Sequence, residues 1–190
     1  MELTKETRQE QIIEEIVKEL NRWAEQHPQK VDGDLFYCPK CTNIGYSRRQ
    51  ETPKCPECGT AMSRYDEDLL RRRRKELVGN FKRVLPDLVG ALVEAASICN
   101  KPLSWRVRNG RIEFELDYYL TKFTYDFVRN TVHAYFFYFD TPLHKKVAEH
   151  LTSALRRLRL GGQLVIYPPH ANPPLPKEAA FRGAAYVIEL

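Results

Sequence analysis

Four cysteines in the first third of the chain form two pairs with the spacing of metal ligands. Residues 38–41 read CPKC, and residues 55–59 read CPECG after an interval of thirteen residues. Each Cys-x-x-Cys turn offers two sulfurs from one tight loop, and two such loops complete a tetrahedron around one soft metal ion. Proline stiffens each turn, and Gly59 permits a left-handed backbone after the second one. The pattern predicts one zinc ion, with iron or a redox dithiol as alternatives; the ligands would be Cys38, Cys41, Cys55 and Cys58.

Residues 34–62 resemble the zinc-ribbon family through the two Cys-Pro-x-Cys knuckles and Gly59. The resemblance implies that the four cysteines are the metal ligands and that short strands flank the knuckles. Thr42 departs from the family pattern, which often has glycine at that position. Four cysteine ligands leave no open coordination position, so the metal is expected to be structural rather than catalytic. Cys99 is expected to be an ordinary buried thiol.

Basic residues form the second chemically informative group. Residues 71–75 read RRRRK. Four consecutive arginines spread around most of a helix, so some must be solvated or paired with the acidic residues at 66–68. A solvated helix face and a phosphate-contact surface are the two interpretations, and arginines at the end of a later helix also complement its dipole. The candidate nucleic-acid-binding residues are Arg71, Arg72, Arg74, Lys75, Lys82, Arg83, Arg156, Arg157 and Arg159.

Aromatic residues alternate along residues 131–139, which read as a strand. Tyr135, Phe137 and Phe139 share one face, and Phe136 and Tyr138 share the other. Exposed aromatic rings on a sheet can stack nucleic-acid bases, but a strand buried on both faces is the more common arrangement.

Acidic residues at alternate positions offer a weaker candidate site. Glu113, Glu115 and Asp117 share one face of a predicted strand, where they either bind a metal or face solvent opposite Arg106. Asp126 and His133 are expected to pair across two strands. The sequence contains no convincing nucleophile–base set and no phosphate-binding glycine loop, which favours a protein that is not an enzyme.

Helical periodicity predicts the elements that must position these groups. The first helix starts at a Thr7–Glu10 capping box or at Thr4, and its apolar stripe packs on the main domain or forms a dimer. Residues 66–99 read as a helix that Pro86 kinks or divides. A third helix starts at Thr141 as N-cap and stops at residues 161–162, which are both glycine.

Strand patterns follow the second helix. Residues 104–108 and 111–117 flank an Asn109-Gly110 turn, which predicts that Trp105 faces Phe114, that Val107 faces Ile112 and that Arg106 faces Glu113. A second hairpin over 122–128 and 131–139 turns at 129–130, so that Phe127 faces Val132 and Phe123 faces Phe136. Residues 163–167 and 184–190 read as further strands, and a stiff proline-rich loop over 168–176 joins them.

This order predicts an α+β fold: an N-terminal helix, a four-cysteine zinc ribbon, and a mostly antiparallel sheet packed with two or three helices. The expected domains are an amphipathic helix over 1–33, the ribbon over 34–65 and the α+β domain over 66–190. No apolar run is long enough to cross a membrane, and the first residues lack a signal-peptide pattern, so a cytoplasmic protein is expected.

The distribution of charge bears on partners. The net charge is +5; residues 1–33 carry eight Asp or Glu against five Lys or Arg, whereas residues 141–190 carry three against seven. Together with the ribbon, this asymmetry predicts a non-enzymatic protein that binds DNA or RNA. It would act as an accessory subunit of a transcription, replication or defence complex, since ribbon-containing subunits occur in nucleic-acid machines, including some CRISPR effector complexes. Other protein subunits are expected partners.

Two other functions remain open from the sequence. The first is a protein–protein adaptor that uses the N-terminal helix and the proline-rich loop. The second is a metal-dependent nuclease that uses Glu113 or Asp140.

Overall fold

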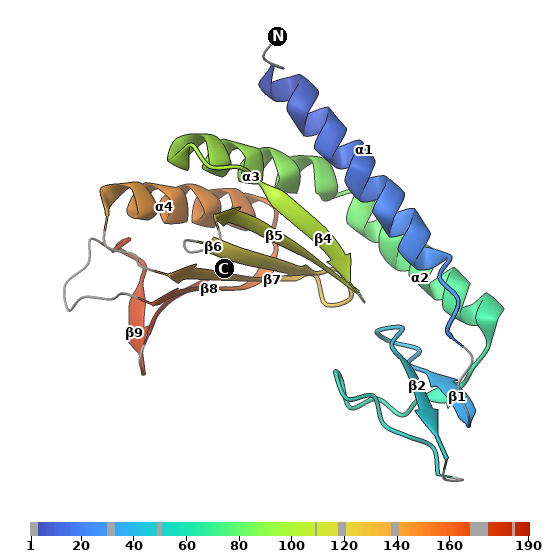
Figure 1. Ribbon diagram of the computed structural model, residues 1–190. Helices are drawn as coiled ribbons and strands as arrows, with labels where there is room; N and C mark the ends of the chain where they lie inside the picture. The colour runs from blue at the N-terminus through green and yellow to red at the C-terminus, as the bar shows by residue number, and fades with distance from the viewer. Residues whose placement is uncertain are drawn as a thin grey trace.

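Two sheets of different size organise the chain. The computed structural model describes residues 4–29, 33–48, 51–108, 110–117, 121–137, 141–167, 175–183 and 185–190. A three-stranded sheet has the order β2-β1-β3, and a seven-stranded sheet has the order β4-β5-β6-β7-β8-β10-β9. Four helices accompany the larger sheet (Figure 1). The fold is therefore α+β with a mostly antiparallel sheet, as the sequence predicted.

The first helix, α1 (Lys5–Ala24), is part of the main core. Thr4 is the N-cap: its side-chain oxygen accepts a hydrogen bond from the Thr7 amide, so the helix begins at the earlier of its two predicted starts. Ile16 and Leu20 are fully buried, and α1 contacts α2, α3 and β4. The apolar stripe thus packs on its own domain rather than remaining available for a dimer.

Pro86 divides the next helical stretch in two. The first helix, α2 (Glu67–Lys82), begins at Asp66, whose carboxylate accepts a hydrogen bond from the Leu69 amide at 2.9 Å. The second, α3 (Leu85–Cys99), has Pro86 in its first turn. Backbone amides in the first turn have no carbonyl partner within the helix, so the missing N–H of proline costs no hydrogen bond there. None of the described helices is long and apolar enough to traverse a lipid bilayer.

The first hairpin has the predicted register. Its strands are β4 (Ser104–Arg108) and β5 (Arg111–Asp117). Trp105 lies opposite Phe114, Arg106 opposite Glu113, and Val107 opposite Ile112. Asn109 lies outside the described residues, whereas Gly110 has φ 68°, the left-handed conformation that the predicted turn requires.

The second hairpin has a longer loop than predicted. Its strands, β6 (Thr121–Asp126) and β7 (Thr131–Phe137), place Phe123 opposite Ala134 rather than Phe136. The reason is the Asp126 carboxylate, which accepts hydrogen bonds from the next two available amides, those of Val128 and Arg129, at 3.0 Å each. These bonds make residues 127–130 a four-residue loop. His133 accordingly lies opposite Thr124, and its predicted pairing with Asp126 is wrong.

A crossover helix joins β7 to a parallel neighbour. Thr141 caps this helix, α4 (Pro142–Arg157), by accepting a hydrogen bond from the His144 amide, as predicted. The predicted stop at residues 161–162 is wrong. The chain leaves the helix at Arg159, which has φ 54°, and the Leu160 amide donates to the Leu155 carbonyl.

The two glycines instead begin the next strand, β8 (Gly161–Tyr167), which pairs in parallel with β7. Gly162 has φ 121°, and a Cβ there would lie 1.9 Å from the Val132 carbonyl oxygen. The strands β9 (Ala180–Arg182) and β10 (Ala185–Glu189) complete the sheet, one strand more than predicted. Residues 168–174 of the proline-rich loop lie outside the described residues.

Among the described residues, helices cover one face of the large sheet. Figure 1 shows α3 and α4 on the same side of it. On β7 the residues that face these helices, Val132, Ala134 and Phe136, are buried. On the opposite side, here called the open face, Tyr135 is half-buried and Phe137 is exposed. Burial of this strand on both faces, the commoner expectation, is therefore wrong; Tyr138 and Phe139 lie outside the described residues.

We predict that Gly162→Ala lowers the free energy of unfolding by at least about 2 kcal/mol, because the backbone conformation and the Val132 carbonyl both exclude a side chain. Gly161→Ala is the matched control, since its Cβ would meet nothing closer than 3.7 Å. Thermal and urea unfolding measure the difference. Equal stability of the two variants would contradict the described β7–β8 contact.

Candidate metal centre and its surroundings

The four cysteines lie on two equivalent turns of the small sheet. Its strands are β1 (Asp34–Tyr37), β2 (Ile44–Ser47) and β3 (Ser63–Arg64). In the first turn the Thr42 amide donates to the Cys38 carbonyl at 2.9 Å, and in the second the Gly59 amide donates to the Cys55 carbonyl at 2.8 Å. Thr42 and Gly59 both have left-handed backbone, with φ 63° and 70°. The departure from glycine at Thr42 thus leaves the turn geometry unchanged.

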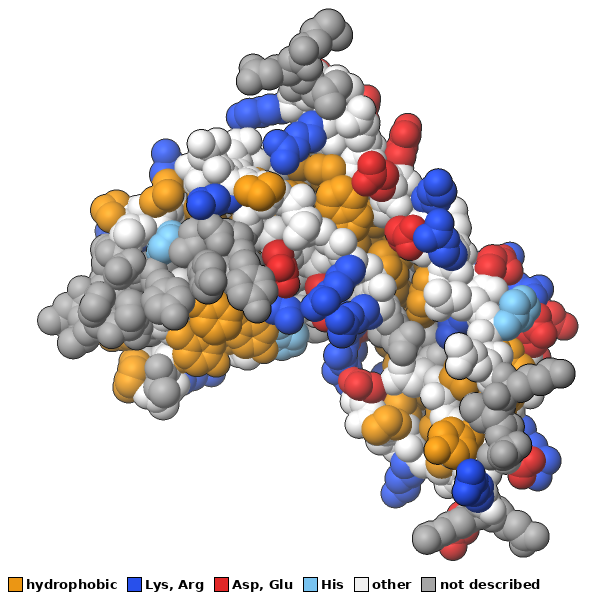
Figure 2. All heavy atoms as spheres, viewed as in Figure 1, with side chains coloured by type: hydrophobic (Ala, Val, Ile, Leu, Met, Phe, Trp, Pro, Cys, Tyr) orange, Lys and Arg blue, Asp and Glu red, His pale blue; other side chains and the backbone are white. Residues whose placement is uncertain are grey.

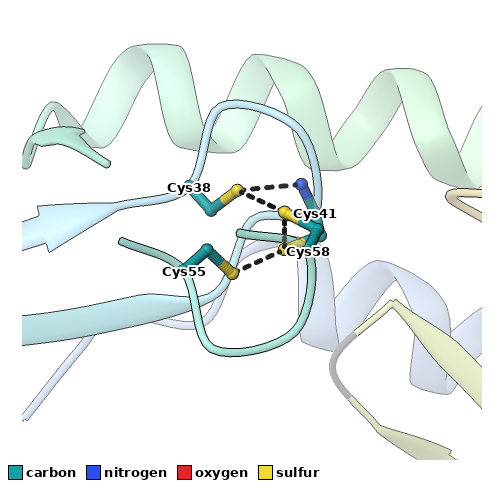
Figure 3. A group of neighbouring side chains, drawn as sticks. All are labelled: Cys38, Cys41, Cys55 and Cys58. Atoms are coloured by element: carbon teal, nitrogen blue, oxygen red, sulfur yellow. Dashed lines mark hydrogen bonds between the residues drawn. The ribbon is translucent and has the colours of Figure 1, made fainter. Parts of the chain in front are cut away.

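The four sulfur atoms converge on one point (Figure 3). All of them lie within 4.8 Å of one another. The closest separations are 3.3 Å between Cys41 and Cys55 and 3.5 Å between Cys38 and Cys58. Among the residues that the structure describes, this is the one group of three or more side chains placed to hold a metal ion. The predicted ligands are therefore brought together, and the site can hold one ion.

The surroundings of the four sulfurs shift the pKa values of their thiols in different directions. Burial raises the pKa of the Cys38 and Cys41 thiols. Hydrogen bonding with Thr60, whose hydroxyl oxygen lies 3.2 Å from the Cys58 sulfur, lowers the pKa of Cys58 to about 6. A metal ion must displace the protons of Cys38 and Cys41, whereas the lowered pKa of Cys58 already favours its thiolate form.

The cysteine module has little apolar core of its own. Phe36 and Met62 pack with Cys38 and Cys55 in a cluster separate from the main core. So few apolar side chains do not by themselves offset the conformational entropy of some thirty residues, and a metal ion bound by the four sulfurs would add folding energy here.

Glu57 in the second knuckle connects this module to the large sheet. Its carboxylate accepts a hydrogen bond from Arg111 on β5 at 2.6 Å, and its backbone carbonyl accepts one from Arg129 at 2.9 Å. Both arginines also approach the Asp126 carboxylate, at 3.7 Å each. Two arginines and two carboxylates thus hold the knuckle against the turns that end β4–β5 and β6–β7. The sequence could not indicate this, because the partners are far apart in the chain.

The arginine run on α2 is largely engaged within the molecule. Arg71 pairs with Glu25 at 3.0 Å and with Glu67 at 2.5 Å, and Lys75 pairs with Glu25 at 2.7 Å. The hydrogen bond from Lys75 lowers the pKa of Glu25. Lys82 donates a hydrogen bond to the Asn21 side chain. These cations therefore attach α2 to α1, and their predicted phosphate contacts stay a prediction.

Arg74 is the most deeply placed of the group. It is 4% exposed, and one guanidinium nitrogen donates to the carbonyls of Trp23 and Gln26 at 3.2 and 3.0 Å. Its guanidinium carbon lies 5.0 Å from the centre of the Trp23 ring. This side chain closes the carboxyl end of α1 through its terminal nitrogen and its contact with the Trp23 ring, whereas its buried Nε has no hydrogen-bond partner.

The remaining predicted cations lie at the surface. Arg156 donates a hydrogen bond to the Glu189 carbonyl on β10 at 2.8 Å. Arg72, Arg83, Arg157 and Arg159 are also exposed, and none of these four forms an ion pair with a described residue.

Three aromatic rings lie side by side on the open face. The Phe137 and Tyr167 rings have centroids 5.7 Å apart and planes 9° apart. The Tyr135 and Tyr167 rings have centroids 6.5 Å apart and planes 13° apart. We call these three residues the aromatic ladder. The sequence indicated Tyr135 and Phe137 but not Tyr167, which joins them only through the parallel pairing of β7 with β8.

The acidic candidates that the structure describes do not form a metal site; Glu115 lies opposite Lys122 in the strand register. Glu113 is approached by both Arg106 and Arg108. The side chain of Asp117, and the whole of Asp140, lie outside the described residues.

Comparison with known proteins assigns no family. No protein-family model matches the sequence, and no curated protein and no solved structure matches it significantly. The function must therefore be argued from the chain's own residues.

We predict that Arg74→Met lowers the free energy of unfolding by about 2–4 kcal/mol, since it leaves two carbonyls without a charged donor and removes the contact with the Trp23 ring. Arg72→Met on the exposed side of the same helix should change it by less than about 0.5 kcal/mol. Urea unfolding measures both. If Arg74→Met left the free energy of unfolding unchanged, the buried arginine would not be what holds the two helices together.

Proposed function

We propose that this protein is a non-enzymatic, nucleic-acid-associated protein with one structural zinc ion, acting as an accessory subunit of a larger complex. Zinc is favoured by the donor set. Tetrahedral zinc–thiolate bonds of about 2.3 Å place the sulfurs about 3.8 Å apart, and the sulfur–sulfur separations here, from 3.3 Å to at most 4.8 Å, bracket that value. Four thiolates fill the tetrahedron and leave no position for a reactive water, which supports a structural role.

The observation that carries the nucleic-acid proposal is an unbalanced group of arginines on the open face, beside the zinc module. The Arg106 and Arg108 guanidinium groups share one carboxylate, that of Glu113. Their side chains are 49% and 59% exposed, whereas that of Glu113 is 14% exposed. The half-buried Glu113 carboxylate cannot neutralise two exposed guanidinium groups, and Glu115, the next carboxylate on this face, lies opposite Lys122. One positive charge therefore remains at the surface. Arginine presents such charge in a geometry suited to phosphate.

The neighbouring surface supports the same proposal. Lys40 on the first knuckle is exposed and lies near Arg111 and Arg129 at the contact between the module and the sheet. Figure 2 shows lysine and arginine side chains gathered where the sheet meets the zinc module. The module would thus add a cation to the arginine-rich end of the open face and fix its position there.

The exposed arginines of α2 and α4 are the second candidate phosphate surface. Arg72 on α2 and Arg83 at its carboxyl end carry the same charge as the open-face pair and are exposed. The adaptor alternative has less support, because the apolar stripe of α1 is buried in the core of its own chain.

We predict one zinc ion per chain in protein purified without chelator. Cys55→Ser should lower the zinc content and expose residues 34–62 to protease, while the helices retain their far-UV circular dichroism. Cys99→Ser is the matched control: this cysteine lies on α3, where its thiol donates to the Ala95 carbonyl, and the variant should retain its zinc. Elemental analysis measures the metal, and well under half an equivalent in the wild type would defeat the assignment.

We predict salt-sensitive nucleic-acid binding that depends on the open face. Fluorescence anisotropy with single- and double-stranded DNA and RNA at several salt concentrations measures it. Arg106→Gln combined with Arg108→Gln should weaken binding and reduce the salt slope by up to ~1.4–1.8, because each phosphate contact contributes about 0.7–0.9. Arg72→Gln combined with Arg83→Gln removes the same charge and should have little effect.

Two other outcomes are informative. Loss of binding in the α2 pair alone would transfer the phosphate contacts to the helix surface that the sequence indicated. A folded, zinc-loaded wild type that binds no nucleic acid at low salt would overturn the proposed function and favour the adaptor.

A further inference from the structure

We propose that the aromatic ladder of Tyr135, Tyr167 and Phe137 is a stacking platform for the unpaired bases of a single-stranded nucleic acid. The inference rests on the proposed function and deepens it, because it assigns the ligand class and the residues that contact the bases. It uses a part of the open face distinct from the arginine pair.

The ladder is accessible and built on a firm base. Phe137 and Tyr167 are 38% and 40% exposed, and they lie directly opposite each other in the β7–β8 register. Val165, the register partner of Tyr135, is buried. The rings therefore stand on two paired central strands of the sheet rather than on a loop. Figure 2 shows a group of hydrophobic side chains exposed on the underside of the sheet, at β7 and β8.

The orientation of the rings favours flat partners. Their planes lie within 13° of parallel along the row, so a planar group that stacks on one ring is also aligned with the next. Nucleic-acid bases are planar and present a π-face whatever their identity, so such a row binds single strands with little sequence preference. Bases in a duplex are already stacked on one another and do not expose these faces.

Polar and charged neighbours suit a polyanion rather than an apolar protein surface. Lys122 on β6 lies in register with Tyr135. Next to the ladder, a row of side chains able to form hydrogen bonds runs across β6, β7 and β8. Its members are Thr124, His133 and Gln163, which lie opposite one another in the strand register. This row continues to Glu113, where the uncompensated arginines lie.

The distances fit one continuous strand. Four strand spacings separate β8 from β4, or about 19 Å across the sheet. A short single strand can therefore place bases on the ladder and direct its backbone toward Arg106 and Arg108. The two groups have separable roles, since stacking supplies salt-independent affinity and the arginines supply the salt-dependent part.

The test compares variants of the full-length, zinc-loaded protein. The probes are labelled oligothymidine and oligouridine of about 15 nucleotides, within the range of single-strand site sizes, and a duplex of the same length. Phe137→Leu combined with Tyr167→Leu removes two rings and keeps apolar side chains in their place. Tyr46→Leu is the matched control, because Tyr46 on β2 is 60% exposed and lies outside the ladder.

We expect wild type to bind the single strands more tightly than the duplex. The ladder variant should bind single strands at least about tenfold more weakly with an unchanged salt slope, whereas Tyr46→Leu should bind like wild type. The oligothymidine and oligouridine arms show whether the sugar matters. Circular dichroism and thermal melting check that each variant is folded, and Tyr135→Leu alone provides a milder change at the same site.

Three results would overturn the inference, and they are distinguishable. If wild type binds duplex as tightly as single strands, or if folded ladder variants keep full affinity, the stacking platform is wrong while the proposed function stands. If wild type binds no nucleic acid at all, the proposed function fails as well. If wild type self-associates in analytical ultracentrifugation and the ladder variants abolish this, the rings belong to an interface between two copies of the chain.

Discussion

The parallel pairing of β7 with β8 is the contact on which the rest of the large domain depends. It joins the β4–β7 meander to the three strands β8, β10 and β9, and it requires the crossover helix α4 that covers one side of the sheet. Backbone must approach backbone closely where the pairing begins, and Gly162 permits this. The same pairing places Phe137 beside Tyr167 on the uncovered side. One set of strand contacts thus generates both the buried core and the surface proposed to bind nucleic acid.

The cysteine module depends on that sheet for its position. Its own apolar cluster is small, and a metal ion held by the four sulfurs would help to offset the entropy of ordering the chain. Glu57 then attaches the second knuckle to Arg111 and Arg129 at the end of the open face. A four-sulfur site of this kind would hold the knuckles, and with them Lys40, beside the arginine-rich end of the sheet, which is the structural role proposed for it.

The arginines show that local charge density in a sequence is a poor guide to the charge at a surface. The densest basic run lies on α2, yet Arg74 is buried against Trp23 and Arg71 is paired with Glu25. Arg106 and Arg108, which are isolated in the sequence, keep part of their charge because a strand places both of them beside one carboxylate. What a polyanion would meet is the charge left after internal pairing, and only the folded chain determines that remainder.

The sequence by itself determined the features whose interacting groups are close together in the chain. These include the two cysteine knuckles, the division at Pro86, the cap at Thr141 and the register of the first hairpin, since spacing and turn chemistry act locally. The second hairpin is also local, but its predicted register is wrong. The Asp126 carboxylate accepts hydrogen bonds from two loop amides, and the loop is longer than predicted. Tertiary structure decided the rest. It decided which arginines are buried, where the knuckles lie and that Tyr167 completes the row of rings. These features depend on contacts between segments that are distant in the chain, and such contacts produce no periodic pattern in the sequence.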